Sequence, residues 1–202
     1  VIGMQLPVEK LANGVKAMAP KLSETTEAGT AAAKAIMTTD TVHKEIAVTF
    51  TAGGKTVTLG GMSKGSGMIH PNMCTMLGFL TTDLAIEKSL LQEALSEVVT
   101  DTFNMITVDG DTSTNDTLVI MANGLAGNAK ITAKGEDYDN FLKALFYVCE
   151  FLAKKMAADG EGATKLFEAK VVNAKSKEDA RTLSRAIVSS NLSKAAIYGC
   201  DA

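Results

Sequence analysis

A glycine-rich segment between Lys64 and Leu77 holds the residue types best able to do chemistry in this sequence. It reads Lys-Gly-Ser-Gly-Met-Ile-His-Pro-Asn-Met-Cys-Thr-Met-Leu, and its glycines allow the backbone to approach a ligand closely. A phosphate-binding P-loop requires Gly-Lys-Ser/Thr, whereas the order here is Lys-Gly-Ser. The dinucleotide-binding pattern G-x-G-x-x-G is also incomplete, because the third glycine is absent. The segment therefore predicts neither kind of nucleotide site.

Thr75 is the candidate nucleophile of this segment, since it follows the small residue Cys74 and precedes an apolar run. A threonine hydroxyl is a weak nucleophile unless a base lies beside it. If the threonine became a chain terminus, its own α-amine, with an unperturbed pKa of about 7.7–8.0, could act as that base. This requires scission of the Cys74–Thr75 bond, by attack of the hydroxyl on the Cys74 carbonyl and hydrolysis of the resulting ester. Residue types alone leave an ordinary strand threonine as the alternative.

The cysteines and histidines predict neither a disulfide framework nor a metal site. Cys74, Cys149 and Cys200 are odd in number and far apart, and His43 and His70 are the only histidines. Cys149 follows an apolar run, so we expect a buried thiol that acts as a small hydrophobe. This usage of cysteine predicts a reducing, cytoplasmic setting.

Three aspartates, Asp109, Asp111 and Asp116, could suggest a calcium loop. The EF-hand spacing and its terminal glutamate are absent, so no metal is expected. Residues 115–116 are interpreted as part of a polar turn, in which Asn and Asp are common, and are assigned no role in a site.

Length and charge limit the class of protein. The 202 residues, 46% of them hydrophobic, suffice for one substantial domain or two small ones with a real core. The 20 Lys+Arg against 23 Asp+Glu give a formal net charge of −3, which gives no electrostatic reason to expect nucleic acid or an anionic membrane as partner. No run of about 18 apolar residues and no signal-peptide pattern occurs, so no membrane association is expected.

The hydrophobic periodicity predicts helices and strands in an irregular order. Gly53-Gly54 between two β-rich runs indicates a hairpin, and Asp137 and Ser176 are the predicted caps of two later helices. Because regular βαβ spacing is absent, the sequence predicts α+β layers rather than a doubly wound parallel sheet. The predicted helices cover about 7–18, 31–35, 86–99, 137–157 and 176–190, and the predicted strands cover 46–51, 55–59, 76–82, 106–108, 117–121, 165–172 and 195–198.

The sequence resembles the ornithine acetyltransferase family, also called glutamate N-acetyltransferases, over nearly its whole length. The segment Lys64–Leu77 is similar to the self-cleavage segment of that family. The resemblance implies a layered αββα-type sandwich, like that of the N-terminal-nucleophile aminopeptidases. The other matching segments, in family order, are Val1–Gly3, Ile36–Thr41, Thr81–Asp83, Asn104–Asp116 and Asp159–Lys165.

The resemblance implies an activity and a set of site residues. Members of the family cut themselves before a threonine and use it to move acetyl from N-acetylornithine to glutamate, and some also accept acetyl-CoA. By resemblance, Thr75 is the nucleophile and the new N-terminus, and Thr38, Lys64 and Glu161 match positions that contact the substrate. No cofactor is implied, apart from acetyl-CoA as a possible substrate.

The charge and hydrogen-bonding capacity of these side chains support the assignments to different degrees. Lys64 could neutralise a substrate carboxylate, and Glu161, between Gly160 and Gly162, could bind a substrate ammonium group. Thr38 could donate or accept a hydrogen bond. A solvated lysine, a solvated acidic turn and an ordinary strand-end threonine are the alternatives that the residue types leave open.

Two residues depart from the family pattern. Cys74 occupies a position where many relatives carry alanine, so its thiol could compete as a nucleophile or be silent. His70 occupies a position where relatives often have a small residue, five residues before Thr75. A base role is conceivable for His70, although a partly exposed loop histidine needs no role.

The resemblance also implies that the chain is the central part of a longer protein. Residues 1–74 correspond to the C-terminal part of an α-chain region, and residues 75–202 to the N-terminal part of a β-chain region that begins with the nucleophile. The family takes its oxyanion hole from a Thr-Gly pair immediately before the segment that matches Val1–Gly3, and that pair is absent here. Removal of even one such donor typically costs about 10²–10³ in kcat, so we expect no catalysis by this chain alone. The expected partners are N-acetylornithine, glutamate, and the cleaved α and β chains paired into a larger oligomer.

Two other functions remain as alternatives. One is a hydrolase like the N-terminal-nucleophile aminopeptidases, and the other is an uncleaved or truncated scaffold without catalysis. The residues of the segment 64–77 favour the acetyltransferase. Comparison of acetyl transfer with peptide hydrolysis separates the two enzymes, and an intact-mass measurement detects scission.

Overall fold

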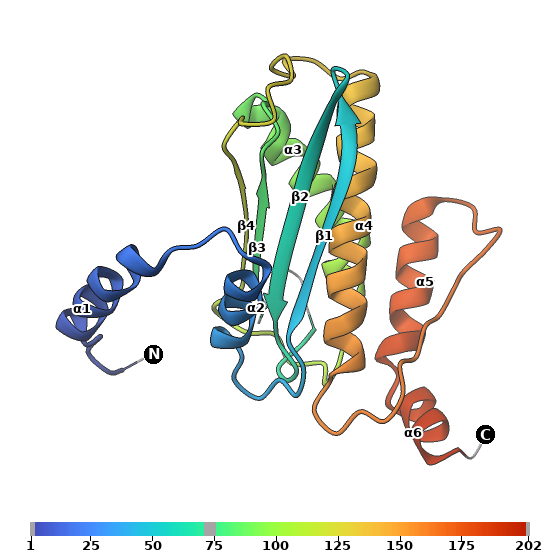
Figure 1. Cartoon of the computed structure of the whole chain (residues 1–202). Helices are drawn as coiled ribbons and strands as arrows, with labels where there is room; N and C mark the ends of the chain where they lie inside the picture. The colour runs from blue at the N-terminus through green and yellow to red at the C-terminus, as the bar shows by residue number, and fades with distance from the viewer. Residues whose placement is uncertain (1–2, 71–75, 201–202) are drawn as a thin grey trace.

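A four-stranded sheet packed against two helices forms the centre of the structure (Figure 1). The computed structural model describes residues 3–70 and 76–200. The strands are β1 (Lys44–Ala52), β2 (Lys55–Lys64), β3 (Leu77–Thr82) and β4 (Thr117–Ala122), and the helices are α1 (Val8–Met18), α2 (Thr26–Ala35), α3 (Lys88–Asp101), α4 (Glu136–Ala158), α5 (Lys177–Ser189) and α6 (Asn191–Gly199), with short 3₁₀ helices η1 (Ala19–Lys21) and η2 (Phe103–Met105). The predicted α+β class is confirmed, with a single mixed sheet in the described residues.

The first three strands form an antiparallel meander. Gly53 (φ +55°) and Gly54 (φ +69°) make the turn between β1 and β2, and two successive positive φ values are what a two-residue hairpin of type I′ requires. The predicted hairpin is therefore confirmed. Its second strand is longer than expected, because it continues through the glycine pair at 60–61 to Lys64.

The fourth strand is parallel to the third, and the chain crosses between them through α3 and η2. Both strands consequently start at the edge of the sheet where β2 ends. One row of the sheet pairs Lys64 with Leu77 and Leu77 with Thr117. This row brings the two ends of the segment 64–77 together.

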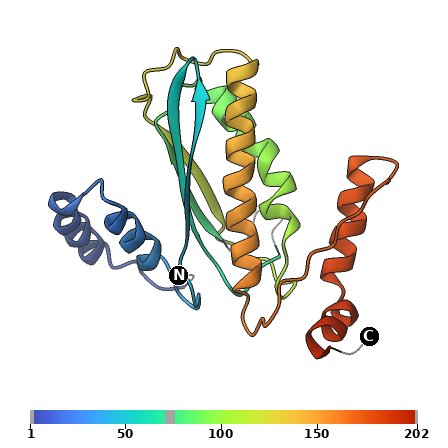
Figure 2. The same ribbon diagram turned by 45° about the vertical axis from the view of Figure 1, so that its right-hand side comes forward.

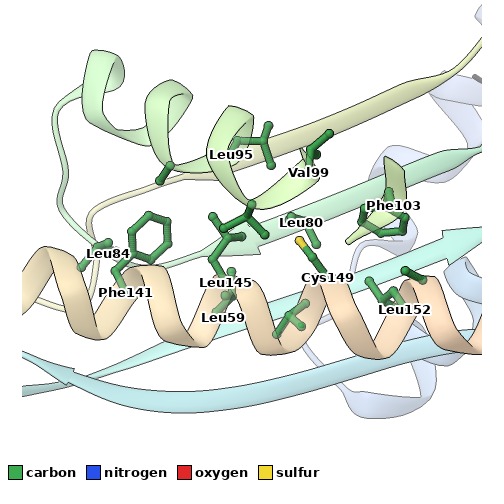
Figure 3. Close-up of a cluster of buried hydrophobic side chains, with 14 of the residues drawn as sticks. Leu59, Leu80, Leu84, Leu95, Val99, Phe103, Phe141, Leu145, Cys149 and Leu152 are labelled. Atoms are coloured by element: carbon green, nitrogen blue, oxygen red, sulfur yellow. The ribbon is translucent and has the colours of Figure 1, made fainter. Parts of the chain in front are cut away.

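The helices α3 and α4 cover one face of the sheet, and the core lies between these two layers (Figures 1 and 2). Gly61 allows this close packing, because a Cβ there would lie 2.5 Å from a Leu80 methyl and 3.1 Å from side-chain atoms of Leu152 and Val148. Burial of apolar surface between the layers is the main source of stability. Figure 3 shows part of this core, which includes Leu59, Leu80, Leu95, Phe103, Phe141, Leu145, Cys149 and Leu152.

Cys149 is fully buried in this core, as predicted. Burial raises the pKa of its thiol to about 12. The thiol is thus protonated at neutral pH and packs as a small apolar group.

Two of the predicted strands have no regular structure. Residues 106–108 run as a loop, where the Val108 amide donates to the Ile69 carbonyl at 2.6 Å, and the side chains of Ile106 and Val108 pack against the core. Residues 165–172 likewise form an extended connection between α4 and α5 without strand pairing. Packing against the core explains the apolar residues of 106–108, whereas Leu166 and Val172 in the second segment are largely exposed.

The last predicted strand, 195–198, is also wrong, because these residues lie in α6. Ser190 caps this helix by accepting a hydrogen bond from the Ser193 amide. The alanines that follow favour a helix, and a short apolar run cannot be distinguished from a strand by periodicity alone.

The two predicted caps have different outcomes. Ser176 caps α5 as expected, with its hydroxyl accepting from the Asp179 amide at 3.0 Å. The residue before α4 is Gly135, which makes no side-chain cap. Asp137 instead accepts a hydrogen bond from the Gly53 amide at 2.8 Å, which ties the β1–β2 turn to the start of α4.

The outer helices flank this centre (Figures 1 and 2). The helices α1 and α2 lie on the side of the sheet opposite α4, and α5 and α6 lie beyond α4. Arg181 of α5 is anchored to Asp101 at the end of α3 by nitrogen–oxygen contacts of 2.6 and 3.1 Å. Among residues 3–70 and 76–200, no helix combines the length and apolar character needed to cross a membrane.

Candidate active site

The candidate site lies at the sheet edge where β2 ends and where β3 and β4 begin. Lys64 is the last residue of β2, and Met76 immediately precedes β3. Cys74 and Thr75, the predicted cleavage site and nucleophile, lie outside the described residues. Thr75 is nevertheless bonded to Met76, so the position of Met76 fixes the end of the sheet to which the nucleophile is attached.

The fold brings Lys64 and Thr38 together, as expected if both contact the same substrate. The Lys64 Nζ donates to the Thr38 hydroxyl at 3.2 Å, although the residues are 26 positions apart. Asp40 holds both loops in place, because one of its oxygens accepts from the Thr38 amide at 3.1 Å and the other from the Gly65 amide at 2.7 Å. The Thr38–Lys64 contact is thus built on a shared carboxylate.

A buried cation neutralises that carboxylate. Lys44 Nζ lies 2.7 Å from Asp40 and 2.6 Å from Asp159, and the side chains of Lys44 and Asp40 are fully buried. Thr41 also donates to Asp159 from both its hydroxyl and its amide. This ion cluster connects the loop after α2, the start of β1 and the residue that follows α4.

The cluster lowers the pKa of both carboxyl groups. Burial alone would raise the pKa of Asp40, but hydrogen bonds from the Gly65 amide and from Lys44 outweigh it and hold the pKa below its usual value. Burial also opposes ionisation of Asp159, and hydrogen bonds from Lys44 and Thr41 outweigh it in the same way. Both groups are therefore ionised partners of Lys44 at neutral pH.

Glu161 reaches the same region from the loop after α4. Its amide donates to the Ser66 carbonyl at 2.7 Å, and a Cβ on Gly67 would lie 2.6 Å from its carboxylate. The Ser66 hydroxyl in turn lies 2.7 Å from the Thr39 hydroxyl. Three of the predicted substrate-binding residues thus lie on connected segments: Thr38 and Glu161 on loops, and Lys64 at the end of β2, next to the loop that is hydrogen-bonded to both.

A cavity of about 240 Å³ opens beside Glu161. One wall is formed by Lys194, whose Nζ donates to the Val108 carbonyl at 2.6 Å and whose pKa is lowered by burial. The cavity could accept a small polar molecule next to the Glu161 carboxylate. Its lining includes Thr107, Leu166, Phe167 and Tyr198.

His70 is held by contacts on both ring nitrogens. Its Nδ1 lies 2.9 Å from the Thr107 hydroxyl, and its Nε2 lies 3.5 Å from the Arg185 guanidinium. Burial lowers the pKa of His70, and the positive charges of Arg185 and Lys194 lower it further. The neutral ring connects the segment before residue 71 to α5, so His70 has a structural role. Its role as a base stays a hypothesis.

Asp109, which the sequence suggested only as a calcium ligand, has a structural role in the fold. Its carboxylate accepts from the Met68 and Ile69 amides, and Met68 has a positive φ of 56°. Asp109 therefore shapes the backbone of the segment 64–77 at residues 68–69. In the described stretches of the chain, no group of three or more His, Cys, Asp or Glu residues could hold a metal ion.

These observations define an α+β domain in which a sheet edge gathers a lysine, a threonine and a glutamate around the segment 64–77. The chain belongs to the ArgJ family, whose family model matches residues 1–202. The resemblance inferred from the sequence is thereby confirmed.

The sequence matches to curated relatives cover the whole of this chain. It is 54% identical over 202 residues to the arginine biosynthesis bifunctional protein ArgJ of Symbiobacterium thermophilum, covering 100% of this chain and 50% of that protein. The ArgJ protein of Bacillus subtilis is likewise 54% identical over 202 residues, which cover 49% of it. A crystal structure of the arginine biosynthesis bifunctional protein ArgJ from Bacillus halodurans is similar, with 54% identity and a TM-score of 0.59 over 61% of this chain and 58% of that one. The chain thus spans about half the length of the curated relatives that it matches.

Proposed function

We propose that the whole protein moves an acetyl group from N-acetylornithine to glutamate through an acetyl ester on Thr75, after scission of the Cys74–Thr75 bond. The observation that carries the proposal is the contact between Lys64 and Thr38 at the sheet edge to which residue 75 is bonded. Membership of the ArgJ family supports the reaction class. Acetyl-CoA is a further possible acetyl donor, and no cofactor is required.

The charges of the site suit the proposed donor. N-acetylornithine carries an α-carboxylate at one end and a side-chain ammonium group at the other. Lys64 would pair with the carboxylate, with Thr38 supplying a hydrogen bond, and Glu161 would pair with the ammonium group beside its cavity. Opposite charges at the two ends of the site would fix the orientation of the acetyl group relative to Thr75.

The proposed chemistry is a double displacement. The Thr75 hydroxyl gives its proton to the Thr75 α-amine and attacks the acetyl carbon, and the amide bond to ornithine breaks as that proton passes to the departing ornithine amine. The α-amine of glutamate then attacks the acetyl ester, which releases N-acetylglutamate and restores the threonine hydroxyl. Both half-reactions need donors for the oxyanion, and in a protein of the relatives' length these would come from outside the present 202 residues.

The sheet would hold the two products of scission together. Scission before Thr75 would leave β1 and β2 in the piece that ends at Cys74 and the later strands in the piece that begins at Thr75, while the antiparallel ladder between β2 and β3 joins the two pieces. This supports a division into α-chain and β-chain regions that stay paired, and further pairing into a larger oligomer is proposed with it.

The proposed αββα-type sandwich requires a second sheet. Between α2 and the sheet face away from α4, a largely apolar cavity of about 570 Å³ is lined by residues that include Ala32, Met62, Phe79 and Met121. Such a surface suits burial by a further layer, which the other half of a protein of the relatives' length would supply.

The test uses the protein expressed at the length of its relatives. We expect the intact mass of the wild type to resolve into two pieces that sum to the uncut mass plus one water, and we expect transfer of acetyl from N-acetylornithine to glutamate with double-displacement kinetics. Thr75→Ala should abolish both, whereas the exposed residue Thr132, changed to alanine, should leave both unchanged. Normal processing and turnover by Thr75→Ala would rule out the proposal. Hydrolysis of peptides without acetyl transfer would indicate the aminopeptidase-like alternative, and a single uncut species without activity would indicate the scaffold.

A further inference from the structure

The two halves of the proposed reaction make opposite demands on one part of the site. A double displacement uses one site twice, because the donor and the acceptor must each bring an amine to the same acetyl ester. The side chain of ornithine ends in an ammonium group, whereas the side chain of glutamate ends in a carboxylate. Glu161 attracts the first of these groups and repels the second. A site in which Glu161 is the sole charge at this point would therefore bind the donor and reject the acceptor.

The cavity beside Glu161 holds a second charge, of the opposite sign. Among the residues that the structure describes, the charged side chains that line this cavity are Glu161, from the loop after α4, and Lys194, from α6. The Glu161 amide donates to the Ser66 carbonyl at 2.7 Å, so the cavity lies beside the residues that follow Lys64. A ligand whose α-carboxylate pairs with Lys64 can therefore extend its side chain toward both an anion and a cation.

Lys194 is held in place yet keeps hydrogen-bonding capacity for a ligand. Its Nζ donates to the Val108 carbonyl at 2.6 Å, which uses one of the three N–H groups of an ammonium ion. The Tyr198 hydroxyl, at the same cavity, already donates to the Lys165 carbonyl at 2.9 Å. Within the described part of the chain, two N–H groups of Lys194 thus remain to bind a carboxylate that enters the cavity.

The surroundings of Lys194 favour an anionic partner. The side chain is partly buried, and burial lowers its pKa because the ammonium group is incompletely hydrated. Asp109 is the carboxylate that counteracts this effect, but its oxygens accept hydrogen bonds from the Met68 and Ile69 amides. A carboxylate that enters the cavity would restore to the ammonium group the stabilisation that burial removes.

We infer that Lys194 is the specificity-determining residue that admits glutamate as the acetyl acceptor, and this inference rests on the proposed function. In the first half-reaction Glu161 pairs with the ammonium group of N-acetylornithine. In the second, after ornithine has left, Lys194 pairs with the side-chain carboxylate of glutamate. The cavity thus accepts two side chains of opposite charge because it carries two opposite charges of its own. No covalent bond to Lys194 forms or breaks, so its effect is on binding of the acceptor.

The first experiment uses the protein at the length of its relatives and compares Lys194→Met with Lys170→Met, an exposed lysine outside the lining of the cavity. In double-displacement kinetics, kcat/KM for each substrate reports the half-reaction that this substrate enters. Lys194→Met should lower kcat/KM for glutamate about tenfold or more, as expected for loss of a hydrogen-bonded charge. The value for N-acetylornithine should not fall, because a charge that repels its ammonium group is removed. A merely structural residue would lower both values. Lys170→Met should change neither, and an equal fall in both values or an unchanged value for glutamate in Lys194→Met overturns the inference.

A second measurement isolates the charge of the acceptor. Glutamine has nearly the shape of glutamate without its side-chain charge, so the ratio of kcat/KM for glutamate to kcat/KM for glutamine reports the proposed pairing. Lys194→Arg should retain the preference of the wild type for glutamate, and Lys194→Met should lower the ratio about tenfold or more. A wild type that uses the two acceptors equally well overturns the inference without any variant. An active wild type whose ratio is unchanged in Lys194→Met overturns the inference alone, whereas absence of both scission and transfer in the wild type overturns the proposed function together with it.

Discussion

Lys44 Nζ lies 2.6 Å from Asp159 Oδ2, and this buried ion pair joins the first residue of β1 to the residue that follows α4. The same ammonium group lies 2.7 Å from Asp40 Oδ1. Thr38 precedes Asp40 by two positions, and Glu161 follows Asp159 by two. One buried cation thus holds the two loops that carry these proposed substrate-binding residues.

Loss of this cation should strongly destabilise the fold. Lys44→Met leaves Asp40 and Asp159 buried without their counter-charge, and removal of one partner from a buried ion pair costs about 3–5 kcal/mol. The free energy of unfolding, measured by urea titration at pH 7, should fall by this amount. The control is Lys55→Met at an exposed strand position, where a change within about 0.5 kcal/mol is expected. Equal losses in the two variants would contradict the assigned importance of the cluster.

The same cluster should make the protein sensitive to acid. The pKa values of Asp40 and Asp159 are lower in the folded protein than in the unfolded chain, whose aspartates titrate near pH 3.9. Below that pH the unfolded chain binds more protons, so the stability contribution is fully present above about pH 5 and is lost as pH falls through the lowered pKa values. The free energy of unfolding, followed from pH 6 to pH 2, should decline less steeply in Asp40→Asn combined with Asp159→Asn than in the wild type. Parallel pH profiles for the two proteins would contradict this assignment.

The sequence predicted the regular elements whose patterns are long or bounded by clear turn residues. The glycine pair at 53–54 predicts the hairpin, and the apolar stripe along 137–157 predicts α4, because each signal is local. The short apolar runs at 106–108 and 195–198 were wrongly predicted to be strands, because local patterns this short are ambiguous. Three or four apolar residues fit a strand, a packed loop or a helix equally well until their tertiary partners are known.

The candidate site was only partly predictable. The resemblance to a family found Thr38, Lys64 and Glu161, but spacing could not reveal that Lys64 contacts Thr38 across 26 residues. The buried ion cluster was missed altogether, since Lys44 and Asp159 are separated by 115 residues and each looks like an ordinary solvated charge in sequence. Asp116 was interpreted as an ordinary turn residue, because only the fold shows that its carboxylate is buried.

A methyl group on Gly67 should disturb Glu161 more than it disturbs the fold. In Gly67→Ala the new Cβ would lie 2.6 Å from the Glu161 carboxylate carbon, so this flexible side chain must move away. If Glu161 binds the substrate ammonium group, a loss of about 1.4 kcal/mol of that interaction raises KM for N-acetylornithine roughly tenfold. Steady-state kinetics of the full-length protein measure the change, and Gly29→Ala is the control, because its Cβ would meet nothing within 4 Å. An unchanged KM in Gly67→Ala would remove Glu161 from the binding site.

Replacement of Asp116 by asparagine should stabilise the folded protein at neutral pH, because its carboxylate is buried. The pKa of Asp116 is about 6 in the folded protein and near 3.9 in the unfolded chain, so the folded state binds its proton more tightly. The wild type therefore loses stability as pH rises from about 4 to about 6, and Asp116→Asn should be more stable by about 1–3 kcal/mol above pH 6 and lose this advantage below pH 4. Urea unfolding at pH 4 and pH 7 measures the difference, with Asp111→Asn expected to match the wild type at both values. A lower stability of Asp116→Asn at pH 7 would mean that the carboxylate holds the structure together.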